Sequence, residues 1–311
     1  MTAPVPNDSV RPAGNTSMPV ANEPLLSLRD VSIQVPSSTK TLTEITHGVS
    51  FDVARGGSVG LVGESGSGKS MTSLAVMGLL PKGSRIDGSI TFDGTDLIHA
   101  RESVMRSIRG DRIAMVFQDP LSSLNPYFTV GDQVMEAYRA HNKATRKEAF
   151  ELTCEAMERV GIPRVKDTVN QFPHQFSGGM RQRIMIAMAL VCQPDLVIAD
   201  EPTTALDVTV QARVLELIRT LQAETGAGLV FITHDLAVVS AMTKEVVVLQ
   251  NGSVQEQGPT RDVFVNPASA YTRKLIEASP RMTDTRLPAT RQHADGAGAR
   301  DPWKGAGHDH R

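Results

Sequence analysis

The chain has 311 residues, 40% of them hydrophobic, which is enough to bury a substantial core in about two domains. Its 32 basic residues against 34 acidic ones give a net charge of −2, so it lacks the electrostatic footprint of a DNA- or RNA-binding protein. The longest uncharged apolar run, residues 184–192, is far shorter than the roughly 18 residues that a membrane-spanning helix needs. We therefore expect no nucleic acid partner, and any role at a membrane has to come through partner proteins.

The N-terminal part of the chain predicts a tail followed by two strands. Residues 1 to about 22 are rich in Pro, Asn, Ser and Thr, and we interpret them as a disordered tail. Residues Leu26–Val35 and Ile45–Val53 then alternate as β-strands do, with a turn expected over residues 36–39. These two strands predict a small N-terminal antiparallel β-subdomain.

A Gly-rich stretch lies between a predicted strand at Ser58–Val62 and a predicted helix at Met71–Leu80. It reads Gly63-Glu64-Ser65-Gly66-Ser67-Gly68-Lys69-Ser70 and matches the pattern G-x-x-x-x-G-K-[ST] of a phosphate-binding loop. Glycines let the backbone N–H groups approach a phosphate closely, and the N-terminus of the helix faces the anion. The pattern predicts that Lys69 reaches the β- and γ-phosphates of a nucleotide and that the Ser70 hydroxyl is a ligand of Mg²⁺.

The next predicted strand, Arg112–Phe117, is continuously apolar, which is typical of a strand buried on both faces of a parallel sheet. It ends at Gln118. Residues 119–176 then change to a mainly helical periodicity, which includes a capping box at Thr145 and Glu148. We interpret this stretch as a helical insert within the sheet domain.

A second helix start suited to an anion follows the insert. Ser177 is a favourable N-cap for an apolar helix that runs to about Cys192. The next two residues, Gly178 and Gly179, would let an anion approach the backbone closely.

Two more buried strands end at residues that can carry chemistry. The strand from Leu196 runs into Asp200 and Glu201, and the strand over 228–233 is followed directly by His234. Because strands alternate with helices here, the sequence predicts an α/β core with a largely parallel sheet. An edge hairpin is expected over 245–257.

In open α/β sheets the reactive groups gather beyond the carboxyl ends of the strands, so we expect these side chains beside the phosphate-binding loop. Asp200 would hold Mg²⁺ through a water molecule. Glu201, one residue farther out, would be the general base for the attacking water. Gln118 would bind either Mg²⁺ or the attacking water, and His234 would sense or position the γ-phosphate.

The chain turns polar and rich in Gly, Pro and Arg beyond about Ala278. We therefore expect a single folded domain over residues 23–278 and a disordered C-terminal tail over 279–311.

Together these motifs resemble the ATP-binding subunit of an ATP-binding cassette (ABC) transporter, over about residues 25–278. The most specific feature is Ser177-Gly178-Gly179, which is similar to the signature sequence of the family. By this resemblance Gln118 corresponds to the Q-loop glutamine, Asp207 to the D-loop aspartate and His234 to the switch histidine. The implied fold is a P-loop NTPase (RecA-like) core with an N-terminal antiparallel β-subdomain and an inserted helical subdomain.

The resemblance also implies an assembly. ATP bound at Lys69 and Ser70 of one ATPase would be closed by the signature residues of a second ATPase, in a head-to-tail dimer that opens after hydrolysis. The implied cofactors are ATP and Mg²⁺. The implied partners are two transmembrane permease subunits and an extracytoplasmic solute-binding protein, which places the chain peripherally on the cytoplasmic face of the inner membrane.

Several segments narrow the resemblance to dipeptide and oligopeptide importers, including nickel-type relatives. They are Phe117-Gln118-Asp119-Pro120, Ser123-Leu124-Asn125-Pro126, residues 176–183, Gly258-Pro259, Asn266-Pro267 and Tyr271-Thr272. Met180 stands where the broader family commonly has Gln, which fits one of two paralogous ATPases and implies a heterodimer. The position expected to stack on adenine lies near Val35, which cannot stack, so apolar contact alone would hold the base.

Other functions remain as alternatives: import of nickel or another small solute, a soluble ABC ATPase acting on ribosomes or DNA, or a P-loop kinase. The single cassette, with no sustained heptads and no basic patch, disfavours the soluble ATPase. A kinase leaves Ser177-Gly178-Gly179 unexplained. The cargo itself cannot be inferred from this chain, because other subunits select it.

Overall fold

The computed structural model describes residues 23–37, 41–118, 123–203 and 206–279. The predicted tails therefore lie outside the described residues, except for Ser279. Residues 38–40 of the predicted turn and residues 119–122 at the start of the predicted insert lie outside them too.

Within the described residues the strands form two sheets. The antiparallel sheet has the order β2-β1-β4-β5, and the larger sheet has the order β10-β9-β3-β8-β7-β6. The strands are β1 (Leu26–Pro36), β2 (Leu42–Val53), β3 (Ser58–Val62), β4 (Arg85–Phe92), β5 (Thr95–Asp96), β6 (Ile113–Val116), β7 (Leu196–Asp200), β8 (Gly228–Ile232), β9 (Glu245–Gln250) and β10 (Ser253–Pro259). The larger sheet is parallel from β6 to β9, and β10 pairs antiparallel at its edge.

Every residue of β3, β7 and β8 is buried, which is why these strands read as continuous apolar runs. They pair in parallel. Ile232 of β8 lies opposite Leu61 of β3 on one side and opposite Asp200 of β7 on the other. Their carboxyl ends therefore meet at one edge of the sheet, together with the end of β6 at Val116. The expected α/β fold with a largely parallel sheet is confirmed.

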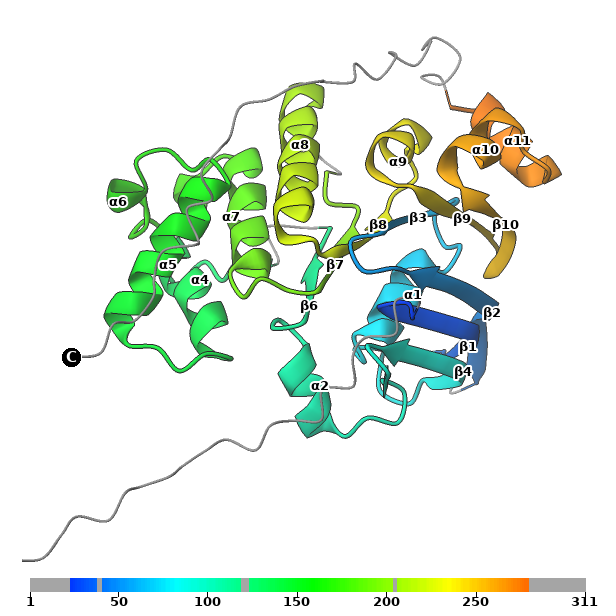
Figure 1. Ribbon diagram of the computed structural model, residues 1–311, viewed down its shortest axis with the longest axis horizontal. Coiled ribbons are helices and arrows are strands. Elements are labelled where there is room, and N and C mark those ends of the chain that lie inside the picture. Colours follow the sequence, from blue (N-terminus) through cyan, green and yellow to red (C-terminus); the bar gives the residue numbers. More distant parts are fainter. Residues whose placement is uncertain (1–22, 38–40, 119–122, 204–205, 280–311) are drawn as a thin grey trace, which may run out of the picture.

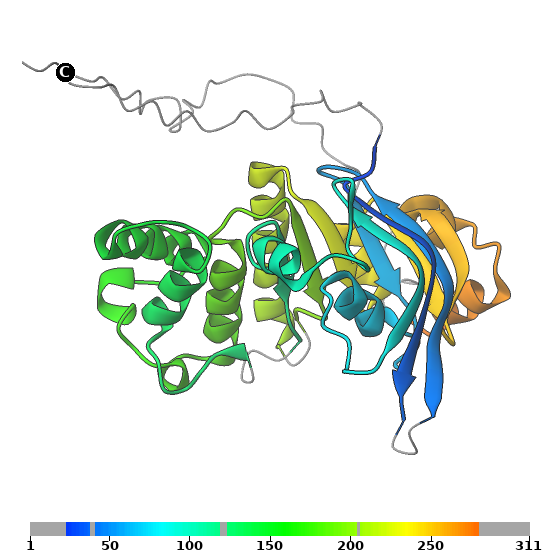
Figure 2. The same ribbon diagram turned by 90° about the horizontal axis from the view of Figure 1, so that it is seen from below.

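Helices cover both faces of the larger sheet (Figure 1). They are α1 (Lys69–Val76), α2 (Glu102–Ile108), α4 (Val130–Arg139), α5 (Arg146–Arg159), α6 (Val165–Thr168), the 3₁₀ turn η1 (Pro173–Gln175), α7 (Gly178–Leu190), α8 (Val208–Thr225), α9 (Leu236–Met242), α10 (Thr260–Val265) and α11 (Ala270–Glu277). Helices α4 to α7 gather at one end of the molecule, and the antiparallel sheet lies at the other (Figures 1 and 2).

Three apolar clusters form the core of the described part of the chain. The first lies between the antiparallel sheet, α1 and one face of the parallel sheet, and it includes Leu28 and Ile198. The second joins the opposite face to the helical end, and it includes Met157 and Phe231. A smaller third cluster lies around β9 and α9, and Val62 at the end of β3 belongs to it.

The predicted capping box is present at the start of α5. The Thr145 hydroxyl accepts a hydrogen bond from the Glu148 N–H at 3.3 Å, and the Glu148 carboxylate accepts from the Thr145 N–H at 2.8 Å. The helix ends before Gly161, which has a φ of +73°.

The first helix differs from its predicted bounds, since α1 begins two residues earlier than Met71 and ends well before Leu80. The cause is a Schellman-type ending at Gly78, where φ is +61°. The Gly78 N–H donates to the Ala75 carbonyl at 3.0 Å, and the Leu79 N–H donates to the Leu74 carbonyl at 2.8 Å. These two bonds close the helix before the apolar pattern ends.

None of the helices in the described ranges combines the length and the apolar character required to span a bilayer.

Candidate active site

The loop between β3 and α1 requires glycine at its two ends. Gly63 has a φ of +150°, and a Cβ there would lie 2.1 Å from the Leu249 carbonyl oxygen of β9. Gly68 is the N-cap of α1, with a φ of +97°, and its Cβ would lie 2.7 Å from the Thr46 methyl group. The loop is therefore pressed between β9 and β2, and only glycine fits at these points.

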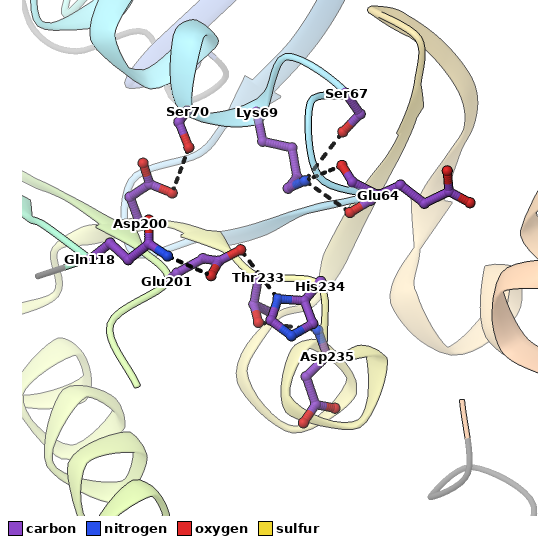
Figure 3. Close-up of polar contacts among 11 residues, drawn as sticks. Glu64, Ser67, Lys69, Ser70, Gln118, Asp200, Glu201, Thr233, His234 and Asp235 are labelled. Atoms are coloured by element: carbon purple, nitrogen blue, oxygen red, sulfur yellow. Dashed lines mark hydrogen bonds and ion pairs between the residues drawn. The ribbon is translucent and has the colours of Figure 1, made fainter. Parts of the chain in front are cut away.

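Lys69 lies inside this loop, with 6% of its surface exposed. Its ammonium group donates to the carbonyls of Gly63 and Glu64, both at 2.8 Å, and to the Ser67 hydroxyl at 3.2 Å (Figure 3). Burial lowers the pKa of Lys69, and the carboxylates of Glu201 and Asp200 oppose that shift. The lysine is thus fixed in position close to the anionic side chains at the end of β7.

Ser70 and Asp200 meet at the end of β7. The Ser70 hydroxyl donates to the Asp200 carboxylate at 3.1 Å, and Asp200 is only 7% exposed. Burial raises the pKa of Asp200; the bond from Ser70 lowers it and the charge of Glu201 raises it further. Gln118 lines the same cavity as Ser70, and the ligands that these three side chains can offer are oxygen atoms, which fits a hard cation such as Mg²⁺.

The Glu201 carboxylate lies between two other side chains (Figure 3). Gln118 donates its amide N–H to one oxygen at 3.2 Å, and Nδ1 of His234 lies 3.2 Å from the other. The backbone of Glu201 has a φ of +45°, which is unusual for a residue with a long side chain. Its N–H donates to the Ile232 carbonyl at 2.8 Å, so pairing with β8 holds this strained conformation.

A cavity of about 630 Å³ opens at this edge of the sheet. The residues that line it are Ile45, Ser65, Gly66, Gly68, Lys69, Ser70, Met71, Gln118, Glu201 and His234. The structure therefore brings together the phosphate-binding loop and the ends of three strands. Gly63, Glu64, Ser67 and Asp200 are not among these lining residues, but their hydrogen bonds hold Lys69 and Ser70 in place.

The N-terminal strands contribute Ile45 to the cavity, a residue that the sequence analysis missed. Val35, near which the adenine contact was expected, is partly buried against the first core cluster and is not among the lining residues. The register of β2 places Ile45 there, because this residue and its neighbour Thr46 lie beside Gly68 of the loop. That register depends on pairing between β1 and β2, which composition alone does not reveal.

Ser177, Gly178 and Gly179 do not line the cavity in the described part of this chain. Ser177 is the N-cap of α7, and its hydroxyl accepts from the Met180 N–H at 3.4 Å. At Gly178, no described heavy atom would lie within 4 Å of an added Cβ, whereas at Gly179 the Val210 side chain would lie 2.4 Å away. The helix start is open on one side and packed on the other.

Asp207 is the N-cap of α8, and its carboxylate accepts from the N–H groups of Thr209 and Val210, both at 3.0 Å. This aspartate too is absent from the lining of the cavity. Because Val210 of α8 packs on Gly179 of α7, Asp207 and the signature residues belong to one neighbourhood, separate from the phosphate-binding loop.

A larger hollow of about 750 Å³ lies beyond the amino ends of β7 and β8. Its charged side chains are already paired: Arg159 with Glu224 at 2.7 Å, Asp195 with Arg112 at 2.7 Å, and Arg55 with Asp93. Charges that neutralise each other give a ligand little to bind, so we assign the chemistry to the edge with the glycine-rich loop.

The fold and the site define a P-loop nucleoside triphosphatase. Comparison with known families refines this class, because the ABC transporter family model matches residues 46–204. The chain belongs to the ABC transporter family and is one of its ATPases. The expected family, fold class and ATP dependence are thereby confirmed.

Curated relatives are similar over most of their length. The dipeptide transport ATP-binding protein DppD of Bacillus subtilis is 46% identical, over 84% of this chain and 78% of the relative. The oligopeptide transport ATP-binding protein OppD of Escherichia coli is 44% identical, over 83% of this chain and 76% of the relative.

Solved structures share the fold. A dimeric ATP-binding cassette in a post-hydrolysis state, bound to ADP and phosphate, has a TM-score of 0.67 and 26% identity, over 76% of this chain and 99% of that one. A component of the ABC transporter complex cbiONQ from Clostridium perfringens has a TM-score of 0.66 and 27% identity, over 84% of this chain and 98% of that one.

Proposed function

We propose that this chain is the ATP-hydrolysing subunit of an ABC importer that takes up peptides across the cytoplasmic membrane. The observation that carries the energy-coupling part is the position of Glu201, whose carboxylate lies between Gln118 and His234 beside the phosphate-binding loop. The names of the relatives, which are peptide import proteins, support the peptide part.

The loop binds the phosphates of ATP through its backbone N–H groups, and Lys69 neutralises the β- and γ-phosphates. Ser70, Asp200 and Gln118 would hold Mg²⁺, which offsets the charge that develops on the phosphates during hydrolysis. Glu201 accepts a proton from the attacking water, since its carboxylate lines the cavity and is held there by Gln118 and His234. His234 orients that carboxylate and contacts the γ-phosphate.

The separation of the signature residues from the cavity supports a dimer. Ser177 and Gly178 form an open helix start without an anion of their own chain, so a second ATPase subunit bound head to tail supplies that anion as its ATP. Met180 favours a partner that is a paralogue, which makes the working unit a heterodimer. Hydrolysis then removes the γ-phosphate that joins the two halves, and the dimer opens.

A mostly apolar groove of about 490 Å³ supports docking on a permease. It lies between β6 and α7 and is lined by Met77, Met115, Phe117, Met185 and Met188, among others. Methionine side chains adapt to an incoming helix, so a cytoplasmic helix of a permease subunit fits there. Two permeases and an extracytoplasmic solute-binding protein complete the importer, and this chain lies on the cytoplasmic face of the membrane.

The test is transport by the complete complex. The chain is purified with its permease subunits, reconstituted in liposomes with the solute-binding protein, and supplied with ATP and a labelled dipeptide. We expect ATP-dependent accumulation that is lost in a Lys69→Ala complex. Accumulation of Ni²⁺ instead of peptide, under the same conditions, would refute the peptide assignment and leave the ATPase role intact.

A further inference from the structure

Tyr271 of α11 contacts the phosphate-binding loop, although 207 residues separate it from Glu64. Its phenolic oxygen accepts a hydrogen bond from the backbone N–H of Glu64 at 3.3 Å. Helix α11 lies against α10 and β10 at the far edge of the parallel sheet (Figure 1). A residue from the last described helix therefore reaches the loop that binds ATP.

The Glu64 N–H belongs to the same peptide unit as the Gly63 carbonyl, and that carbonyl accepts from the Lys69 ammonium at 2.8 Å. A peptide unit is planar and trans, so its N–H and C=O point in opposite directions. Fixing the N–H on Tyr271 therefore fixes the direction of the carbonyl that holds Lys69. Because Gly63 has no side chain to restrict its backbone, a contact of this kind limits rotation of the peptide.

Helix α11 is anchored firmly enough to act in this way. The Glu256 carboxylate of β10 accepts from the N–H groups of Ala268 and Ser269, at 2.8 and 3.0 Å. The Ser269 hydroxyl in turn accepts from the Tyr271 N–H at 3.2 Å. The Tyr271 ring packs on the third core cluster, which also contains Val62, the residue directly before the loop.

We propose that Tyr271 is a positioning residue that orients the Gly63–Glu64 peptide and, through it, the ammonium group of Lys69 for binding the phosphates of ATP. The inference rests on the role proposed above for Lys69. It gives helix α11 a role in nucleotide affinity that the sequence motif of the loop does not indicate.

The test is the affinity of the full chain for ATP in the Tyr271→Phe variant, which removes only the hydroxyl. Loss of one neutral hydrogen bond should raise the dissociation constant of Mg-ATP by about 2- to 10-fold. The KM for ATP should rise by a similar factor while kcat changes less than about twofold, because the bond acts on ground state and transition state alike. Hydrogen exchange of the Glu64 amide should become faster.

Tyr127→Phe is the matched control, since that hydroxyl is on a side chain that is 86% exposed and lies outside the loop. It should bind ATP as the wild type does. Wild-type ATP affinity or an unchanged exchange rate of the Glu64 amide in Tyr271→Phe would overturn the inference. So would a fall in kcat with an unchanged KM.

Lys69→Ala separates this inference from the proposed function. If Lys69→Ala binds ATP at least about tenfold more weakly while Tyr271→Phe behaves as the wild type, only the role of Tyr271 fails. If Lys69→Ala retains full affinity, the role proposed for the loop fails, and the inference fails with it. Should Tyr271→Phe unfold more easily, the Glu256→Gln variant tests the same anchor and should also raise the dissociation constant.

Discussion

The two helix starts to which we assign anion binding, at α1 and α7, are built differently. At α1 the loop residues are already bonded to one another: Lys69 to the Gly63 and Glu64 carbonyls and Ser70 to Asp200. At α7 the N-cap Ser177 bonds only within its own first turn, and a Cβ on Gly178 would meet no described atom. The first site has charged groups to perform chemistry, whereas the second offers only backbone and a hydroxyl. The difference supports our proposal that the first site acts on the phosphate and that the second completes its enclosure.

The largest expected effect comes from the site at α1, which carries the charged groups. In Glu201→Gln the side chain keeps its shape and an oxygen acceptor, but it loses the basic carboxylate. We expect ATP hydrolysis to fall by about 10²- to 10⁴-fold, the usual contribution of a general base, with ATP still bound. Gel filtration of the variant together with its partner ATPase and Mg-ATP should then show an accumulated closed dimer. Hydrolysis at the wild-type rate would exclude Glu201 as the base.

A smaller effect is expected on the enclosing side, from Gly178→Ala. The added methyl group has free space within the described chain, so folding and the ATP affinity of the dilute monomer should not change. In the proposed dimer the methyl group would face the nucleotide of the other subunit, and we expect the ATPase rate to fall by about tenfold, equivalent to ~1.4 kcal/mol. The measurement is ATPase activity as a function of protein concentration.

Gly179→Ala is the matched control for that experiment, because its methyl group would meet the Val210 side chain at 2.4 Å. It should lower the free energy of unfolding by about 1–3 kcal/mol, as overpacking does. Gly178→Ala should leave that free energy within about 0.5 kcal/mol of the wild type. Equal activities of Gly178→Ala and wild type at concentrations where the dimer forms would contradict the proposed enclosure.

The sequence predicted which side chains gather beside the phosphate-binding loop, because the patterns that indicate them are local. The loop motif specifies its own strand and helix, and the apolar strands end directly at Gln118, Glu201 and His234. What it missed depends on pairing between distant segments. Ile45 enters the cavity through the register of β1 with β2, and Tyr271 reaches the loop only because α11 packs on β10. No periodicity within either segment carries that information.

The smallest effect concerns the free energy of unfolding, which the buried charge of Asp200 at the α1 site lowers. Burial raises the pKa of Asp200 above its value in the unfolded chain, so the folded state binds the proton more tightly. Stability from this group is therefore present at low pH and is lost as the pH rises through the raised pKa. In Asp200→Asn the buried charge is absent, and the Asn oxygen can still accept from Ser70. We expect a gain of about 0.5–2 kcal/mol in unfolding free energy at about pH 8, together with loss of ATPase activity.

The pH dependence of that gain distinguishes a buried charge from improved packing. Without Mg²⁺ and ATP, the advantage of Asp200→Asn over the wild type should shrink as the pH is lowered from about 8 to values below the raised pKa of the wild-type carboxyl, which then becomes protonated. Urea unfolding of both proteins at each pH measures the difference. A gain that is constant between these pH values would mean that the charge of Asp200 is not penalised in the folded chain. The site at α1 would then carry no electrostatic penalty in the absence of its ligand, as the α7 helix start does not. The two sites would differ only in the chemistry of their side chains.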